Sequence, residues 1–476
     1  MANPFSLIIA GVDSGANLLD LPAPSATTTP YVELGSLSLT LSGDNAPGAM
    51  NFTVIQPKTP SGTLPWWRSG AVYDNARVQF FDSRYSATTP LFLGYISNIQ
   101  GEILENGIGT RATVQVTGAT GWLQSTIIRN GKTGIRATSF VDSFTLGTST
   151  STDRDIINGL LARVHTQVND ATTREILNTA VISGSTRAIF TGSAQTIGKQ
   201  TFKATTLQSA LDAVAEEAGG VADVQYRFWV DGDGRLNYGP KVAASTYATA
   251  PAEIVTDPAS IQTGSTTTPT RLFARDLQVN LDHDNIVKGI FVMADSAYAR
   301  YDNNQTYPTA PTNDPYFRTY TGTYSRNGAG LASRSGPLPH EVFSAPKIVK
   351  KSDRGTQIGA LARGTMTTRA QPRRTVSFTI AGGNLSQTAS PDWEYGYSQG
   401  YPVAAATPYT LAKAWLPGMY VKVTAPMLDL SSTILYIPTV TMRFADGGGT
   451  YQVQYEIEAD FRRQYISGLR GLVGGE

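Results

Sequence analysis

The sequence contains no cysteine and only three histidines among its 476 residues. Without cysteine the chain has neither a disulfide framework nor a thiolate metal site, and a thiol nucleophile is excluded. No segment approaches the ~18 consecutive apolar residues of a membrane-spanning helix, and residues 1–15 lack the positive and apolar regions of a signal peptide. We therefore expect a soluble chain that is made in the cytosol and stabilised by packing and assembly.

Charge is also scarce, because only 16% of the residues are charged, against about a quarter in an average domain. The 38 basic and 37 acidic residues nearly cancel, which leaves a net charge of +1. A balanced chain has no overall attraction to nucleic acid or anionic lipid. Glycine (46) and proline (26) are abundant instead, which favours a β-rich, loop-rich protein of two to four domains.

Metal-binding motifs are weak. None of His165, His283 and His340 has a companion at metal-ligand spacing, and we interpret Asp282-His283-Asp284 as a polar turn between strands. The segment Asp231-Gly232-Asp233-Gly234 resembles the start of a calcium loop, but Arg235 stands where the next oxygen ligand belongs. We therefore predict a hairpin turn at this segment and no metal site.

Catalytic motifs are equally weak. The carboxylate pairs Glu102/Glu105 and Glu216/Glu217 invite comparison with glycosidases, which need two carboxylates facing each other across a sugar. The first pair follows a Gly-rich turn pattern and the second lies on the polar side of a predicted helix. Neither GxSxG nor a P-loop occurs. We expect no catalytic residue, no cofactor and no metal ligand.

A three-strand phrase occurs twice. From Arg77 the chain reads RVQFFDSRYSATTPLFLGYISNI and then RATVQVTGATGWL; from Met419 it reads MYVKVTAPMLDLSSTILYIPTV and then TYQVQYEIEADF. Alternating β-branched and aromatic residues mark the strands, and Gly, Asn, Asp and Pro mark the breaks. The repeat predicts two related small barrels, and three copies of such a chain would present sixfold-like order.

Between the two phrases the pattern changes. Residues 152–168 carry an apolar stripe with a spacing of four, and TTLQSALDAVAEEAGG predicts a second helix that is capped by threonine and ends at Gly219. YRFWVDGDGRLNYGP predicts a hairpin, and residues 352–370 predict a further helical stretch.

We thus predict a mainly β fold with α+β insertions, comprising two related small β-barrels, a mixed α/β domain and a loop-rich insert. The expected divisions are 1–125 (first barrel), 126–240 (mixed α/β domain), 241–301 (linker and start of the second barrel), 302–383 (loop-rich and helical insert) and 384–476 (remainder of the second barrel and the tail).

In this order the segments resemble the tail-tip or baseplate hub proteins of tailed bacteriophages and related injection machines. IIAGVDSG with the following LSLTLS and FTV is similar to the first barrel of a hub, and FLGYISNI with VQVTGATGWL to the hairpin that leads into the α/β domain. NLDHDNIVKGIFVMA resembles the start of the second barrel and LPGMYVKVTAP its final strands. The resemblance covers nearly the whole chain.

The resemblance implies a structural, non-enzymatic subunit in a homotrimeric ring on the tail axis of the virion, assembled in the host bacterial cytoplasm. The ring would join the sixfold tail tube or distal tail ring to a threefold central tip or fibre protein, around the DNA exit channel. The tape measure protein is a further candidate partner. Because the chain ends soon after the second barrel phrase, we expect any cell-wall enzyme or receptor-binding module on another polypeptide.

Aromatic residues in loops are the candidate interface residues, because tyrosine and tryptophan combine large contact areas with a polar tip. They are Trp66, Trp67, Tyr307, Tyr316, Phe317, Tyr320, Tyr324, Trp393, Tyr395, Tyr397 and Tyr401. The alternative is that these side chains cover the core of their own domain.

Basic residues that could face the channel or a partner are Lys347, Lys350, Lys351, Arg354, Arg373 and Arg374. A positive run is more often a solvated face. DNA must slide through a channel, so we expect weak lining, no stable nucleic-acid binding and no membrane insertion.

Two other functions remain open from the sequence. A carbohydrate-binding or receptor-binding tail protein would also have barrels and tyrosine-rich loops. A polysaccharide-degrading tail enzyme would need converging carboxylates in a cleft.

Overall fold

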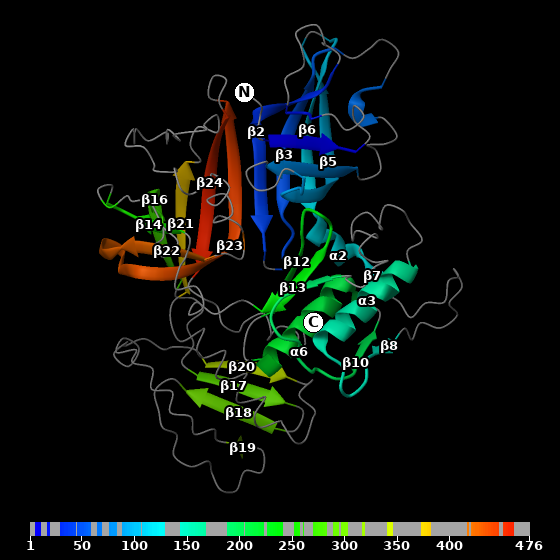
Figure 1. Ribbon diagram of the computed structural model, residues 1–476, viewed down its shortest axis with the longest axis vertical. Helices are drawn as coiled ribbons and strands as arrows, with labels where there is room; N and C mark the ends of the chain where they lie inside the picture. Colours follow the sequence, from blue (N-terminus) through cyan, green and yellow to red (C-terminus); the bar gives the residue numbers. More distant parts are fainter. Residues whose placement is uncertain are drawn as a thin grey trace.

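One large sheet of 13 strands dominates the computed structural model (Figure 1). The structure describes residues 5–10, 17–19, 29–43, 45–58, 64–68, 76–82, 88–105, 107–128, 143–167, 188–203, 205–222, 226–240, 252–257, 260, 270–282, 289–294, 297–302, 317–318, 340–345, 373–381, 417, 420–446 and 451–460. The mainly β fold with few helices that the sequence predicts is confirmed.

The first half of the large sheet is formed by residues 5–118. Its strands are β1 (Phe5–Ile9), β2 (Tyr31–Ser42), β3 (Ala49–Gln56), β4 (Arg77–Asp82), β5 (Phe92–Ile103) and β6 (Thr110–Gly118). They pair in the order β1, β4, β5, β6, β3, β2. Leu18 bridges the two outer strands, because its N–H donates to Leu7 (2.9 Å) and its carbonyl accepts from Val32 (2.7 Å). The first half is therefore strongly curled.

The second half lies beside it. Its strands are β14 (Ala252–Val255), β15 (Thr270–Phe273), β16 (Arg275–Asp282), β21 (Arg373–Ala381), β22 (Tyr420–Ala425), β23 (Leu430–Asp446) and β24 (Tyr451–Asp460). They pair in the order β15, β14, β22, β23, β24, β21, β16. The two ends of this series are β15 and β16, and only Ala274 separates them along the chain. The chain therefore passes directly from one end of the series to the other.

The two halves repeat the same strand order. Taken along the chain, six strands in each half pair in the spatial order first, fourth, fifth, sixth, third, second, when β14, β16, β21, β22, β23 and β24 are matched to β1 to β6. The two phrases of the sequence form β4, β5, β6 and β22, β23, β24, each an antiparallel series. One difference is that β1 runs antiparallel to β4, whereas β14 runs parallel to β22.

A single hydrophobic core joins both halves, because the inward residues of their strands form one cluster. Alternation builds it locally: in β6 the β-branched and small residues Ala112, Val114 and Val116 are buried, and they alternate with half-buried or exposed residues. Phe444 of the second half packs edge-on against Phe5 of the first, with ring centroids 5.0 Å apart. The halves are therefore packed as one body.

A mixed α/β unit with its own core, between Leu123 and Tyr238, packs below the first half (Figure 1). Its elements are α2 (Trp122–Ser125), β7 (Ile127–Ile128), β8 (Ser143–Leu146), α3 (Asp153–Gln167), β9 (Ala188–Phe190), β10 (Gln200–Lys203), β11 (Thr205–Thr206), α6 (Leu207–Ala222), β12 (Tyr226–Val230) and β13 (Leu236–Pro240). Short 3-10 turns are η2 (Trp66–Arg68), η3 (Ala119–Gly121) and η6 (Pro426–Leu428).

The helices of this unit begin where their caps predict. The Oγ1 of Thr152 accepts from the Asp155 N–H (3.3 Å), and the Asp155 carboxylate accepts from the Thr152 N–H (2.9 Å), which forms a capping box. The Oγ1 of Thr206 accepts from the Ser209 N–H (3.1 Å).

The predicted end of the second helix at Gly219 is wrong, because α6 continues to Ala222. Gly219 does not have the positive φ of a C-terminal cap. Glycine within a helix costs only ~1 kcal/mol, and Ala222 packs against the core of the unit. Tertiary packing therefore outweighs the local stop signal.

A four-stranded sheet forms the remaining described part. Its strands are β17 (Gly289–Ala294), β18 (Ala297–Asp302), β19 (Phe317–Arg318) and β20 (His340–Ala345). Of the strands within the segment 275–302, β16 joins the large sheet while β17 and β18 belong to this separate sheet. The predicted helical stretch 352–370 lies outside the described residues. Within the part of the chain that the structure describes, no helix is long and apolar enough to cross a membrane.

Candidate assembly interface at the junction of the sheet halves

The seam between the halves is a backbone pairing of β2 with β23. The two strands run antiparallel, with Ser38 opposite Arg443 and Ser42 opposite Thr439. On the inner face Leu39 is completely buried, and on the outer face the hydroxyls of Thr40 and Thr441 lie 3.1 Å apart. Main-chain hydrogen bonds and an apolar inner face together hold the two halves in one register.

Asn45, in the loop between β2 and β3, docks the first half onto the α/β unit. Its Nδ2 donates to the Asp212 carboxylate of α6 (3.0 Å), and its Oδ1 accepts from the Phe228 N–H of β12 (2.9 Å). Its main chain bonds to Phe228 (3.2 Å) and accepts from Gln208 Nε2 (3.1 Å). Asparagine suits this position because its φ is +57° and few other side chains tolerate that region.

Burial of the Asp212 carboxyl raises its pKa to about 6, although the hydrogen bond from Asn45 lowers it. A carboxyl whose pKa is higher in the folded state stabilises the fold fully only below its unfolded pKa. That stability is lost as the pH rises through about 6. At neutral pH the ionised Asp212 therefore opposes the docking that Asn45 provides.

The Asp212→Asn variant tests this sign. Its amide oxygen still accepts the bond from Asn45, so we expect it to be more stable than the parent by about 2 kcal/mol at about pH 8 and nearly equal at about pH 4. Denaturant unfolding at both pH values measures the difference. A stability difference that stays constant across this range would contradict the assignment.

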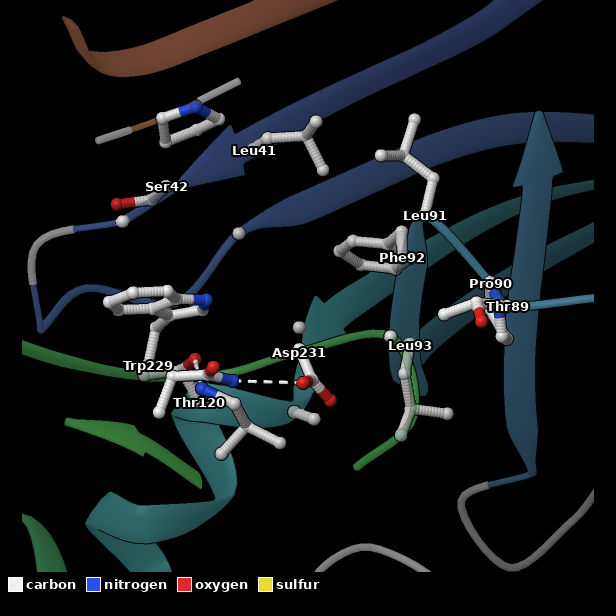
Figure 2. A pocket seen from close by; sticks show the side chains of 18 residues that line it. Leu41, Ser42, Thr89, Pro90, Leu91, Phe92, Leu93, Thr120, Trp229 and Asp231 are labelled. Atoms are coloured by element: carbon white, nitrogen blue, oxygen red, sulfur yellow. Dashed lines mark hydrogen bonds between the residues drawn. The ribbon is translucent and has the colours of Figure 1, made fainter. Parts of the chain in front are cut away.

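A small cavity lies where the hairpin of β12 and β13 meets the end of the first half. Its volume is about 230 Å³, below the ~300 Å³ of most small-molecule sites. Figure 2 shows Leu41 and Leu91 on one side and Trp229 and Asp231 on the other. Pro417, which precedes β22, also lines it. The cavity is therefore a gap at a three-way junction of structural parts.

The only carboxylate among the described lining residues is that of Asp231. Its Oδ1 accepts from the N–H groups of Asp233 (3.0 Å) and Arg235 (2.9 Å), and its Oδ2 accepts from Asn237 (2.9 Å). The carboxylate thus holds the hairpin turn, and burial raises its pKa. Glycoside hydrolysis needs two facing carboxylates, which the described lining residues of this cavity do not supply. Among the described residues, no cluster of carboxylate and imidazole groups could hold a metal ion.

Arg227 on β12 links the α/β unit to the second half. Its guanidinium stacks 4.5 Å from the Trp229 ring and donates to the Tyr436 hydroxyl of β23 (2.8 Å). The same hairpin is bonded to the first half, because the Phe228 N–H donates to Asn45 Oδ1 (2.9 Å). The hairpin therefore contacts both halves and braces the seam.

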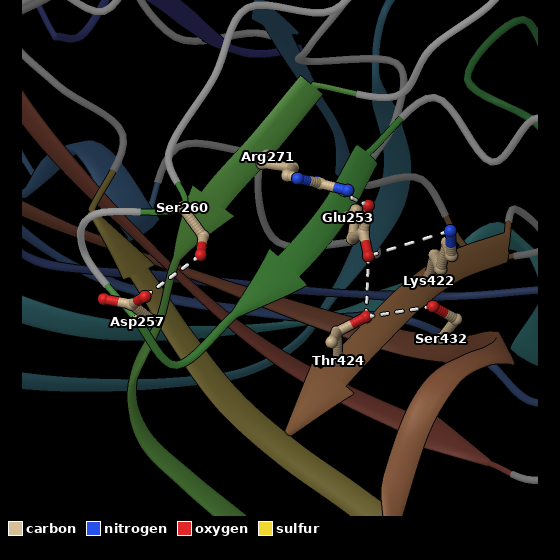
Figure 3. A network of polar contacts seen from close by, with 7 residues as sticks. All are labelled: Glu253, Asp257, Ser260, Arg271, Lys422, Thr424 and Ser432. Atoms are coloured by element: carbon tan, nitrogen blue, oxygen red, sulfur yellow. Dashed lines mark hydrogen bonds and ion pairs between the residues drawn. The ribbon is translucent and has the colours of Figure 1, made fainter. Parts of the chain in front are cut away.

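A buried ion cluster lies further along the second half, on β14, β15 and β22 (Figure 3). The carboxylate of Glu253, 2% exposed, bonds Arg271 Nε (3.0 Å) and Thr424 Oγ1 (2.6 Å), with Lys422 at 3.7 Å. Burial alone would raise the pKa of Glu253, but these three partners outweigh it and the pKa is lowered. The cluster therefore stabilises these neighbouring strands above the unfolded pKa of the carboxyl, and that stability is lost as the pH falls through the folded pKa.

Of the candidate interface residues from the sequence, only Trp66 and Trp67 have described side chains. Trp66 is buried in the core of the first half, and Trp67 is partly buried beside Gly101 of β5 with its ring edge-on to Trp66. In a single chain both side chains therefore pack against the core of their own half.

Phe317, Arg373 and Arg374 lie in strands β19 and β21, but their side chains are outside the described part. The other candidates lie outside the described residues altogether: Tyr307, Tyr316, Tyr320, Tyr324, Trp393, Tyr395, Tyr397, Tyr401, Lys347, Lys350, Lys351 and Arg354. An interface or channel role for these residues stays a prediction.

Solved structures share this architecture over nearly the full chain. The tail protein from Neisseria meningitidis has a TM-score of 0.54 at 11% identity, covering 98% of this chain and 99% of that chain. The 43 kDa tail protein of prophage MuSo2 from Shewanella oneidensis has a TM-score of 0.53 at 10% identity, covering 97% and 99%. The chain has the fold of these tail proteins.

The resemblance to phage tail proteins stated from the sequence is thus confirmed for the fold. A weaker likeness, with a TM-score of 0.40 at 10% identity, covers 96% of this chain and 78% of an E. coli component of the type VI secretion system. No family profile matches the sequence, and no curated protein matches it.

Sequence reasoning missed the residues that hold the junction of this tail-protein fold. Asn45 stands among the turn-forming residues SGDNAPG, a pattern that can indicate a turn but not its partner. For Arg227 and Trp229 the sequence predicts only a place in a hairpin. The pairing of β2 with β23 joins residues 401 positions apart, as between Thr40 and Thr441, and alternation in a strand does not name its partner.

Proposed function

We propose that this chain is the structural hub subunit of a phage tail tip or baseplate. Three copies form a ring in which the two curled halves of each chain act as related barrels. One face of the ring docks the sixfold tail tube or distal tail ring, and the other grips a threefold central tip or fibre protein. The DNA exit channel runs through the ring, and the tape measure protein is a further partner within it.

The observation that carries this proposal is the repeated strand order, with both halves fused in one sheet. Each chain contributes two similar halves, so three chains present six similar positions around an axis. Such a ring can bind a sixfold partner on one face and a threefold partner on the other. The fold likeness to tail proteins supports a place in the virion tail. The function is then mechanical and non-enzymatic.

The divisions expected from the sequence remain part of the proposal, with one change to the place of β17 and β18. The first barrel covers 1–125 and the α/β domain covers 126–240. The later segments 241–301, 302–383 and 384–476 hold the linker and start of the second barrel, the insert, and the remainder with the tail. We place β17 and β18 with the insert, because they pair outside the large sheet.

Single-particle imaging of the purified protein, with its native mass measured on the same sample, tests the proposal. We expect a threefold ring with an axial hole and six similar densities. A monomer that binds cell-surface glycans would favour the receptor-binding alternative, and polysaccharide cleavage that one Asp or Glu substitution abolishes would favour the enzyme. Either result would overturn the hub function.

A further inference from the structure

We infer that the free edge of β5 pairs with β16 of a second copy of this chain, in the register that β23 and β2 adopt within one chain. The inference rests on the proposed function, because it specifies how neighbouring copies in the ring contact each other. It follows from matching the two halves residue by residue. Inside one chain, β2 of the first half pairs with β23 of the second half. The strands that correspond to them are β16 and β5, and their matching edges are unpaired among the described strands.

The first match is between β5 and β23. Tyr95 lies opposite Arg77 and Thr117, and Tyr436 lies opposite Tyr420 and Asp460. Just beyond these tyrosines each strand has a bulge, after Ile96 in β5 and after Tyr436 in β23. The regular pairing resumes at Asn98 and at Thr439 respectively. Residues 98–102 of β5 therefore correspond to residues 439–443 of β23, the segment that pairs with β2.

The second match is between β2 and β16. Thr40 lies opposite Ala49, which lies opposite Thr117. Asn280 lies opposite Thr375, which lies opposite Asp460. Since Thr117 and Asp460 hold matching places in the two halves, Asn280 corresponds to Thr40. Residues 278–282, the end of β16, therefore correspond to residues 38–42, the segment of β2 in the seam.

Both edges lack a strand partner among the residues that the structure describes. On the side of β5 opposite β6, pairing with β4 ends at Tyr95, and among the described strands β16 pairs only with β21. In the seam, the corresponding edges of β23 and β2 pair with each other. Unpaired edges of this kind are templates for strand addition from another chain.

Burial differs between the seam and these edges in the expected sense. In the seam, Leu39 and Val440 are buried, whereas the corresponding Val279 and Ile99 are only partly buried. The contrast is largest at the end of the strands, where Phe444 is 4% exposed and the corresponding Ile103 is 74% exposed. The apolar residues at the free edges therefore occupy positions that are buried in the seam, but in a single chain they stay partly or largely exposed.

The register follows directly. Gln100 of β5 lies opposite Asn280 of the neighbouring copy, in the place of the Thr441 and Thr40 hydroxyls that lie 3.1 Å apart in the seam. Two amide side chains at this place can donate and accept reciprocally. Glu102 lies opposite Gln278, which can donate to it. The contact joins different surfaces of two copies, and such contacts form rings when the rotation closes.

Cysteine pairs test the register, because the chain has no cysteine of its own. We expect Gln100→Cys with Asn280→Cys to give a covalent trimer on mild oxidation, and a mixture of the two single variants to give a covalent dimer. Thr40→Cys with Thr441→Cys is the matched control, which closes inside one chain without a change of mass. Non-reducing gels and native mass of the full chain measure the products.

The control separates two failures. A threefold ring in which the 40/441 pair closes but the 100/280 pair stays reduced would overturn the edge assignment and leave the proposed function standing. A chain that stays monomeric while the 40/441 pair closes would overturn both.

Charge variants give an independent readout on the native ring. Both Gln100 and Asn280 are exposed in the single chain, so substitutions there leave the fold intact. We expect Gln100→Arg with Asn280→Arg to raise the dissociation constant of the trimer at least about tenfold through like-charge repulsion. Gln100→Arg with Asn280→Asp restores assembly. Equal assembly of both variants would overturn the pairing.

Discussion

Replacing Gly232 with alanine is expected to push the β12–β13 hairpin away from the first half and to cost about 3 kcal/mol of unfolding free energy. Gly232 is buried in the hairpin turn, and a β-carbon there would overlap the carbonyl oxygen and carbon of Pro90. These are main-chain atoms, so they cannot rotate away as a flexible side chain would. The hairpin or the loop between β4 and β5 must move instead.

Gly35→Ala is the matched control, because nothing lies within 4 Å of a β-carbon at Gly35 and its φ is ordinary. We expect its free energy of unfolding to stay within about 0.5 kcal/mol of the parent or to rise slightly. Denaturant unfolding compares the two variants. Hydrogen exchange of the Val230 amide, which is bonded to Thr120 Oγ1, reports the separation locally. Equal stability of both variants would show that the hairpin does not bear on Pro90.

Local chemistry explains which parts of the fold the sequence predicted. The strands of both phrases alternate apolar and polar residues, and Thr152 and Thr206 cap α3 and α6 as their positions indicate. These signals depend on neighbours within a few residues. The predicted end of α6 was wrong because the true end depends on the contact of Ala222 with core residues that are far away in the sequence. Short-range patterns therefore gave the elements and most of their limits.

The assembly of those elements depends on partners that no local pattern names. The sequence predicts β2 and β23 as strands, but their pairing follows from the register of a sheet whose strands come from both ends of the chain. Glu253 illustrates the same point, because its cationic partners Arg271 and Lys422 come from different strands. The resemblance implies the order of the parts, whereas the seam and its bracing depend on contacts between residues that are far apart in the sequence.

Asn45 is expected to be the most sensitive side chain at the junction. We expect Asn45→Ala to cost about 4 kcal/mol, because it removes the bonds to Asp212 and to the Phe228 N–H and because alanine tolerates a φ of +57° less well than asparagine. The two polar groups that remain would be left half-buried without these partners. Hydrogen exchange of the Phe228 amide should accelerate more than exchange in the core of the first half.

Asn45→Gly separates the two causes, because glycine adopts a positive φ freely and keeps the main-chain bonds to Phe228 and Gln208. We expect it to cost about 2 kcal/mol, the share of the two side-chain hydrogen bonds. Denaturant unfolding of both variants measures the split. If alanine and glycine were equally destabilising, backbone conformation would contribute nothing. If glycine matched the parent, the side-chain bonds would not hold the first half to the α/β unit, and the bracing would rest on Arg227 and the contact of Gly232 with Pro90.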